Sequence, residues 1–145
     1  MQAAVRETPV LDLIGNTPML PLRFPERGLT VYVKAEYLNP SGSVKDRLAR
    51  YLIEDAERRG LLRHDSIIVE CSSGNTGIAL AMVGAVKGYA VRILMSASAS
   101  TERRHLLHQF GAEVVLFEPM SGSHSFTYEG ETSTTDLPVD VANRS

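Results

Sequence analysis

The sequence predicts an α/β domain with a central parallel sheet in a three-layer arrangement. From Thr30 onward, short apolar runs typical of strands alternate with longer segments of helical periodicity. Gly60, Gly88 and Gly111 follow the helical segments, at positions where a glycine commonly ends a helix. Strands and helices that alternate in this way form parallel sheets joined by right-handed crossovers.

Four apolar runs are the expected strands of this sheet. Each is separated from the next by a segment of helical pattern, so we expect all four to lie in one parallel sheet. The runs are residues 31–33, 67–69, 91–94 and 114–117.

The first helical segment begins within residues 39–47 and ends before Gly60. Apolar residues recur along it at intervals of four, namely Val44, Leu48, Leu52 and Ala56. This spacing predicts that their common face packs on the core and that the opposite face is solvated.

The other two helical segments differ in character. Residues 76–87 are apolar nearly all round, which predicts a buried helix. The third segment extends from Thr101 to Phe110, with Ser100 as its expected N-cap. We expect it to bury Leu106, Leu107 and Phe110.

The periodic pattern ends after Glu118. Residues 119–145 are rich in serine, threonine and acidic residues and have no sustained period, so we expect a divergent, loosely ordered tail. Residues 1–118 then form an N-terminal segment followed by the small α/β domain.

Composition limits the classes of function. At 145 residues and 43% hydrophobic content, the chain is long enough for one packed domain. A net charge of −2 gives no basic face for nucleic acid, and no apolar run is long enough to span a membrane. The start of the chain lacks the apolar core of a signal peptide. The single cysteine, Cys71, excludes an internal disulfide framework, and we expect a cytoplasmic protein.

Two motifs carry the expected chemistry. Residues 39–47 (NPSGSVKDR) place turn formers before a helix, so Lys45 lies in the first helical turn. Residues 72–77 (SSGNTG) join an apolar strand to an apolar helix, where free backbone N–H groups can hold a carboxylate or phosphate. A lysine that can form a Schiff base beside such a loop suggests amino-acid chemistry on pyridoxal phosphate.

Five segments, spread from about residue 10 to about residue 116, share a family pattern. They are residues 13–20, 34–40, 39–47, 72–77 and 102–104. Together they closely resemble the cysteine synthase and cystathionine β-synthase branch of the pyridoxal-phosphate enzymes. The resemblance implies the small domain of the tryptophan-synthase-β-like fold.

The resemblance also implies residue roles. Lys45 would bind pyridoxal 5'-phosphate and later move the substrate's α-proton, in a setting that we expect to be buried. Asn75 would hydrogen-bond the ring hydroxyl of the cofactor. The substrate carboxylate would be held by the whole loop, that is Ser72, Ser73, Gly74, Asn75 and Thr76.

Some positions depart from the family pattern. Cys71 stands where relatives commonly have proline, which puts the rigidity of the loop in doubt. The small residues at 96–100 suggest a flexible edge beside the site. We expect Cys71 to be a small buried thiol rather than a nucleophile. His105 and His108 are three apart on one helix, but a solvated face is favoured over a metal site.

Three hypotheses for function follow. The first is β-replacement on an activated serine, with O-acetyl-L-serine and sulfide giving L-cysteine and acetate; O-phosphoserine or a cystathionine β-synthase-like reaction are variants of it. The second is an inert, truncated remnant that binds anions, because the family's phosphate-binding cup belongs to a later domain and residues 121–123 (SGS) are a poor substitute. Its apolar N-terminal segment would favour a homo-oligomer or association with a full-length relative. A dinucleotide-binding module is disfavoured, since no G-x-G-x-x-G opens a helix.

Overall fold

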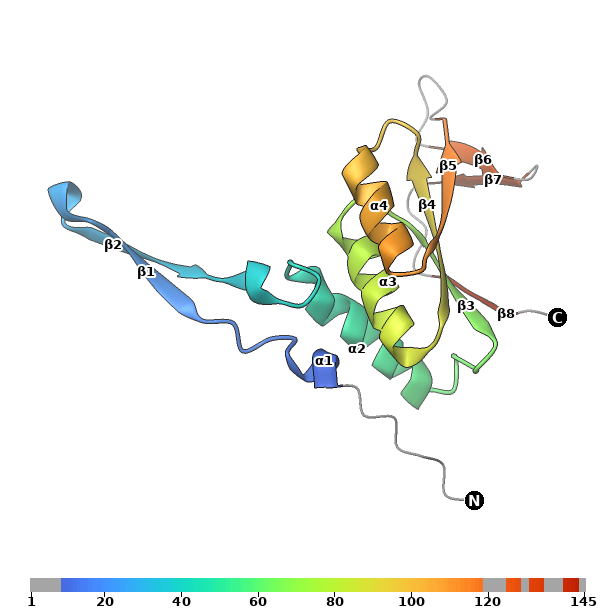
Figure 1. Ribbon diagram of the computed structural model, residues 1–145, viewed down its shortest axis with the longest axis horizontal. Helices are drawn as coiled ribbons and strands as arrows, with labels where there is room; N and C mark the ends of the chain where they lie inside the picture. The colour runs from blue at the N-terminus through green and yellow to red at the C-terminus, as the bar shows by residue number, and fades with distance from the viewer. Residues whose placement is uncertain (1–8, 119–124, 129–130, 135–139, 144–145) are drawn as a thin grey trace, which may run out of the picture.

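A computed structural model describes residues 9–118, 125–128, 131–134 and 140–143, the last three ranges through their backbone alone. Figure 1 shows a body of helices and strands from which a two-stranded arm projects. A short helix, α1 (Pro9–Asp12), precedes the arm. None of the helices within the described ranges is long and apolar enough to cross a membrane.

The central sheet has the strand order β5-β4-β3-β8. Strands β3 (Ser66–Cys71), β4 (Ala90–Ser96) and β5 (Glu113–Phe117) run parallel to one another. The fourth strand, β8 (Asp140–Asn143), pairs with β3 in the antiparallel direction. The α/β class with a parallel sheet, predicted from the alternating pattern, is therefore confirmed.

Three helices accompany the sheet on one side in Figure 1. They are α2 (Lys45–Arg58), α3 (Asn75–Lys87) and α4 (Thr101–Gln109). Helix α3 is central, since it packs against β3, β4, α2 and α4. Gly84 allows part of this close approach, because a Cβ atom there would lie 2.4 Å from Cγ2 of Val91.

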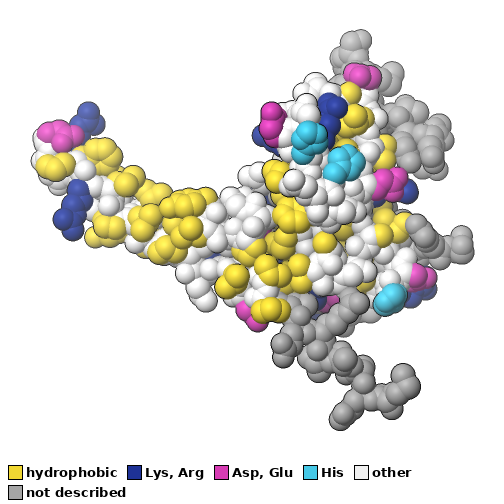
Figure 2. Space-filling view, viewed as in Figure 1, with side chains coloured by type: hydrophobic (Ala, Val, Ile, Leu, Met, Phe, Trp, Pro, Cys, Tyr) yellow, Lys and Arg dark blue, Asp and Glu magenta, His cyan; other side chains and the backbone are white. Residues whose placement is uncertain are grey.

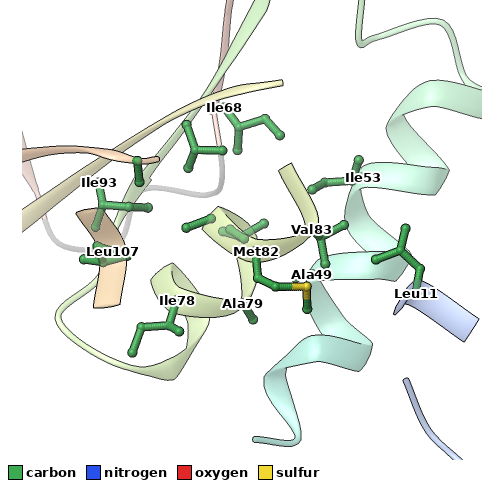
Figure 3. Close-up of a cluster of buried hydrophobic side chains, with 14 of the residues drawn as sticks. Leu11, Ala49, Ile53, Ile68, Ile78, Ala79, Met82, Val83, Ile93 and Leu107 are labelled. Carbon is green, nitrogen blue, oxygen red and sulfur yellow. The ribbon is translucent and has the colours of Figure 1, made fainter. Parts of the chain in front are cut away.

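The hydrophobic core surrounds α3. Residues Gly77 to Gly84 of this helix are all buried, which confirms the prediction of a buried helix. Figure 3 shows Ile68 and Ile93 of the sheet on one side of α3 and Ala49 and Ile53 of α2 on another. A helix with apolar neighbours on several sides needs apolar residues around its whole circumference.

The expected strand at residues 31–33 does not belong to the central sheet, and that prediction was wrong. It lies in β2 (Leu29–Lys34), which pairs antiparallel with β1 (Met19–Phe24) to form the arm. A 3₁₀ turn, Pro25–Arg27, and Gly28 with a φ of 58° connect the two strands. A loop with a short 3₁₀ helix, Glu36–Leu38, joins β2 to α2, and within the described ranges β2 pairs with β1 and not with β3, β4 or β5.

The pairing register separates the two faces of the arm. Directly opposite residues share a face of an antiparallel pair. One face therefore consists of three apolar pairs, Leu20 with Val33, Leu22 with Val31 and Phe24 with Leu29. All six side chains are 38–49% exposed, and Figure 2 shows apolar side chains along the arm. The other face carries Lys34 and Arg23.

The buried face of α2 also differs from the prediction. Val44 and Leu48 are exposed, whereas Ala49 and Ile53 are buried. An interval of four residues exceeds the 3.6-residue turn, so such a stripe winds away from any straight contact line. The buried seam instead alternates steps of three and four.

The exposed residues of α4 follow the same geometry. Leu107 is buried as expected, but Leu106 is 41% exposed, because neighbouring helical residues point about 100° apart. His105 and His108 are exposed, in agreement with the expected solvated face.

The segment after Glu118 contains short strands that the sequence pattern did not predict. Strands β6 (Ser125–Tyr128) and β7 (Glu131–Thr134) pair with each other in the antiparallel direction. The segment 121–123, the expected nearest match to a phosphate loop, lies outside the described residues.

Candidate active site

The starts of α2 and α3 lie at the same end of the body. The two helices pack against each other and run in the same direction in Figure 1. Helix α3 begins directly after the carboxyl end of β3, so this end is also the carboxyl edge of the parallel strands. Ligand sites in open parallel sheets occur at that edge.

Asp46 fixes the start of α2. It is completely buried, and its carboxylate accepts hydrogen bonds from the Ser41 N–H, at 2.7 Å, and from the Ser41 hydroxyl. The N–H of Lys45 donates to Oγ of Ser43 at 3.2 Å. The turn before α2 is therefore held by side chains of the motif itself.

A second, longer-range network holds the same turn. Arg47 donates from Nε and Nη2 to the two carboxylate oxygens of Glu36, at 2.9 and 3.0 Å. The Thr17 hydroxyl and the Asn39 carboxamide donate to the same carboxylate at 2.7 and 2.9 Å. These hydrogen bonds lower the pKa of Glu36 to about 2. The bond from Arg47 has the largest effect, followed by those from Thr17 and Asn39.

This network joins the base of the arm to α2. Oδ1 of Asn39 accepts a hydrogen bond from the Gly15 N–H at 2.9 Å, and Lys34 donates to Oγ1 of Thr17 at 2.8 Å. Sequence reasoning missed these contacts. Their residues stand in segments 13–20 and 34–40, which had served only to support the family resemblance.

Lys45 is exposed, so the expected buried setting was wrong. The chain has two other lysines, and both are engaged. Lys34 bonds to Thr17 and lies 3.8 Å from Glu36, and Lys87 pairs with Glu57 at 2.7 Å. The Lys45 amine has no hydrogen bond or ion pair with any residue that the structure describes.

Ser72 holds the loop before α3. Its Oγ accepts the N–H groups of Gly74 and Gly77 at 3.2 and 3.3 Å, and its own N–H donates to the Leu94 carbonyl at 3.0 Å. These three bonds fix the loop in the absence of the proline that relatives commonly have. Within the described ranges the N–H groups of Asn75 and Thr76 have no acceptor, so they are available to an anion.

A pocket of about 190 Å³ lies beside this loop. Its lining comes from the ends of three strands and the loop: Cys71, Ser72, Ser73, Leu94, Met95, Ser96 and Phe117. Lys45, Asn75 and Thr76 do not line it, so the structure groups only Ser72 and Ser73 of the expected site residues in one pocket. The thiol of Cys71 is partly exposed rather than buried, and desolvation and the Glu70 carboxylate raise its pKa.

The structure thus combines an α/β fold with an accessible amine at the start of α2 and unpaired N–H groups at the start of α3. A family model described as pyridoxal-phosphate dependent enzyme matches residues 10–136, and the chain belongs to this family. The family's cofactor is pyridoxal 5'-phosphate, as the motifs predicted.

Relatives agree with the expected branch of the family. Cysteine synthase 3 of Caenorhabditis elegans is 45% identical over 130 residues, which cover 88% of this chain and 39% of the relative. O-ureido-L-serine synthase of Streptomyces lavendulae is 50% identical over 115 residues, covering 79% of this chain and 36% of the relative. A crystal structure of a hydrogen sulfide-producing enzyme from Fusobacterium nucleatum has a TM-score of 0.73 at 46% identity and covers 78% of this chain and 37% of that one. The chain thus spans about two-fifths of the length of these relatives.

Among the described residues, groups at the starts of α2 and α3 are chemically suited to hold this cofactor. An aldehyde needs an unengaged primary amine, which Lys45 offers at the start of α2. The exposed Asn75 offers a carboxamide at the start of α3. Both groups lie at the end of the body where the two helices begin (Figure 1).

The Glu36 network makes a prediction about acid stability. The pKa of Glu36 is about 2 in the folded protein, below the ordinary value of 4.5, so the unfolded chain binds this proton more readily. The stability that the carboxylate contributes is complete above about pH 4.5 and is lost as the pH falls toward 2. Glu36→Gln should therefore flatten the pH dependence of the free energy of unfolding in this window, as measured by urea unfolding.

Glu26→Gln is the matched control, since it removes an exposed carboxylate at the tip of the arm and leaves the network intact. If the free energy of unfolding changed equally with pH in the wild type and in Glu36→Gln between pH 2 and pH 4.5, this assignment would be contradicted.

Proposed function

We propose that this chain carries the lysine and the carboxylate-binding loop of a β-replacement enzyme that converts O-acetyl-L-serine and sulfide to L-cysteine and acetate. The observation that carries the proposal is the amine of Lys45. It alone among the three lysines lacks a partner within the described residues, and it opens the helix packed against α3. The cysteine synthases among the relatives support the reaction class.

Each site residue has a role in this proposal. Bound pyridoxal phosphate supplies an aldehyde that reacts with amines and a ring that accepts electrons from the substrate Cα. Lys45 would hold the cofactor through that aldehyde, and its amine, when free, would take the proton from the substrate Cα. The Asn75 carboxamide would donate a hydrogen bond to the ring hydroxyl of the cofactor.

The loop is suited to the substrate carboxylate. Oγ of Ser72 already accepts two N–H groups, so its own proton is free to donate to a carboxylate oxygen. The hydroxyls of Ser73 and Thr76 and the N–H groups of Asn75 and Thr76 add donors at the positive end of α3. Gly74 has no atom within 4 Å of the Cβ position, which leaves the backbone approachable.

The proposed substrates can vary at the leaving group and the nucleophile. One relative is named O-ureido-L-serine synthase, so closely similar sequences carry different reactions. O-phosphoserine as the activated substrate, or a cystathionine β-synthase-like reaction, uses the same lysine and carboxylate loop.

A second proposal is that the chain by itself is catalytically inert and binds anions or a longer relative. It is supported by the chain spanning about two-fifths of its relatives. In this proposal residues 1–118 are the functional unit and residues 119–145 are a divergent tail. For either proposal we infer a cytoplasmic location from the lone cysteine.

Reductive labelling tests the role of Lys45. Addition of pyridoxal phosphate followed by borohydride should place the label on Lys45, because its amine is the unengaged one. Lys45→Arg, which keeps the charge but cannot form a stable adduct, should abolish the label, as read by peptide mapping. Label shared equally by Lys34 and Lys87 would defeat the assignment and favour the inert chain.

Two alanine variants test the loop. Thr76→Ala should weaken O-acetyl-L-serine binding about tenfold, the loss of one hydrogen bond to a charged group. Asn75→Ala should instead weaken pyridoxal phosphate more than the amino acid. Amide chemical shifts at Ser73 and Thr76 measure the first affinity, and absorbance of the cofactor measures the second. Equal losses of both ligands in both variants would show a general collapse of the turn.

The arm supports a proposal about association. Its six-residue apolar face is exposed, and an isolated two-stranded hairpin is only marginally stable in water. We propose that this face mediates self-association or binding to a longer relative. The double variant Leu22→Lys with Val31→Glu should abolish it, because it charges the face while placing opposite charges across the pair.

Thr30→Glu is the control, as it pairs with Arg23 on the other face. Light scattering should show mass rising with concentration for the wild type and the control but not for the double variant. A wild-type chain that stays monomeric and does not bind a cysteine synthase would rule out this role of the arm.

A further inference from the structure

Ser96, the last residue of β4, lines the pocket beside Ser72, and the loop to α4 follows it directly with Ala97, Ser98, Ala99 and Ser100. The Ala97 N–H donates to the Phe117 carbonyl at 2.8 Å, and the Ala99 N–H donates to the Ser96 carbonyl at 2.9 Å. The N–H groups of Ala97 and Ala99 are therefore paired, and the carbonyls of the same two residues take donors from outside the loop.

Arg104 supplies those donors. Its Nη2 donates to the Ala97 carbonyl and, at 3.0 Å, to the Ala99 carbonyl. The side chain reaches back from the first turns of α4 to the loop that precedes the helix. Its Nε is buried and has no hydrogen-bond partner within the described residues. This unpaired buried donor has a free-energy cost, and the two hydrogen bonds from Nη2 to the carbonyls offset it.

We propose that Arg104 is a positioning residue that holds the β4–α4 loop and so fixes Ser96, which lines the pocket together with Ser72 and Ser73. Since one guanidinium binds the carbonyls on both sides of Ser98, the loop cannot move at Ala97 without losing contact at Ala99. The small residues of this loop, which favour flexibility by composition, are thereby held in one arrangement. Only the interpretation of the pocket as part of the substrate site rests on the proposed function, and the test of Arg104 requires no substrate.

The chain contains its own reporter for this wall. Cys71 is the single cysteine, it lines the same pocket, and it is partly exposed. Its rate of reaction with iodoacetamide therefore measures how open the pocket is. Hydrogen exchange at the Ala97 and Ala99 N–H groups measures the order of the loop directly.

The test compares Arg104→Met with Arg103→Met. Both variants remove one positive charge from neighbouring positions of α4, but Arg103 is exposed and has no hydrogen bond with the described residues. Arg104→Met should speed exchange at Ala97 and Ala99 about tenfold or more, the loss expected for hydrogen bonds from a charged donor. Cys71 should also be alkylated faster, while exchange in the core of α3, at Leu80 to Val83, stays at its wild-type rate. Arg103→Met should match the wild type in all three measurements.

Equal exchange at Ala97 and Ala99 in the two variants would overturn the proposal. So would faster exchange spread evenly over the loop and α3, since that would make Arg104 a general stability residue. If Arg104→Met does not fold, Arg104→Lys and Arg103→Lys replace the pair. A lysine keeps the charge, but its shorter side chain ends one bond before the position of Nη2, from which Arg104 reaches both carbonyls, so the Arg104→Lys loop should exchange faster than the Arg103→Lys loop. Failure of Lys45 to take the cofactor would bear on the proposed function and leave these measurements unaffected.

Discussion

Burial of α3 is the constraint on which the rest of the structure depends. This helix must find apolar partners around its whole circumference, and it does so against β3, β4, α2 and α4. Its packing along α2 aligns the two helices, and their alignment brings both N-termini to the carboxyl end of the sheet (Figure 1). An apolar requirement in the core thus places Lys45 and the loop of residues 72–77 at one edge of the domain.

The starts of α2 and α3 at this edge are held by different sets of hydrogen bonds. The start of α3 is fixed locally, because Ser72 accepts two N–H groups of the turn that follows it. The start of α2 is fixed locally by Asp46 and Ser41 and also over a longer distance, through the ion pair between Glu36 and Arg47 and the bonds that Thr17 adds. A doubly hydrogen-bonded arginine–carboxylate pair constrains orientation as well as distance. The turn that carries the lysine therefore depends also on residues far from it in sequence, whereas the loop before α3 depends mainly on its own.

This difference explains how much the sequence could predict. Most patterns within one segment were read correctly: the strands at 67–69, 91–94 and 114–117 lie in β3, β4 and β5, and α3 is buried, although the predicted buried face of α2 was wrong. Partnerships between segments were not. An apolar run of three residues does not encode its neighbour, so residues 31–33 were misplaced in the central sheet, and the Glu36 network left no local pattern. The burial of a helix start also depends on distant segments, so the expectation that Lys45 is buried failed for the same reason.

The exposed amine of Lys45 and the exposed apolar face of the arm belong to segments that the Glu36 network connects. The chain passes from β2 through Glu36 directly to the start of α2, so the base of the arm and the lysine are joined by the Glu36 network. Six apolar side chains of the arm are 38–49% exposed, and an exposed apolar face of this kind is typical of a surface that contacts another protein. The Glu36 network ties the base of the arm to the turn that carries Lys45, so the exposed amine and the exposed apolar face are parts of one hydrogen-bonded framework.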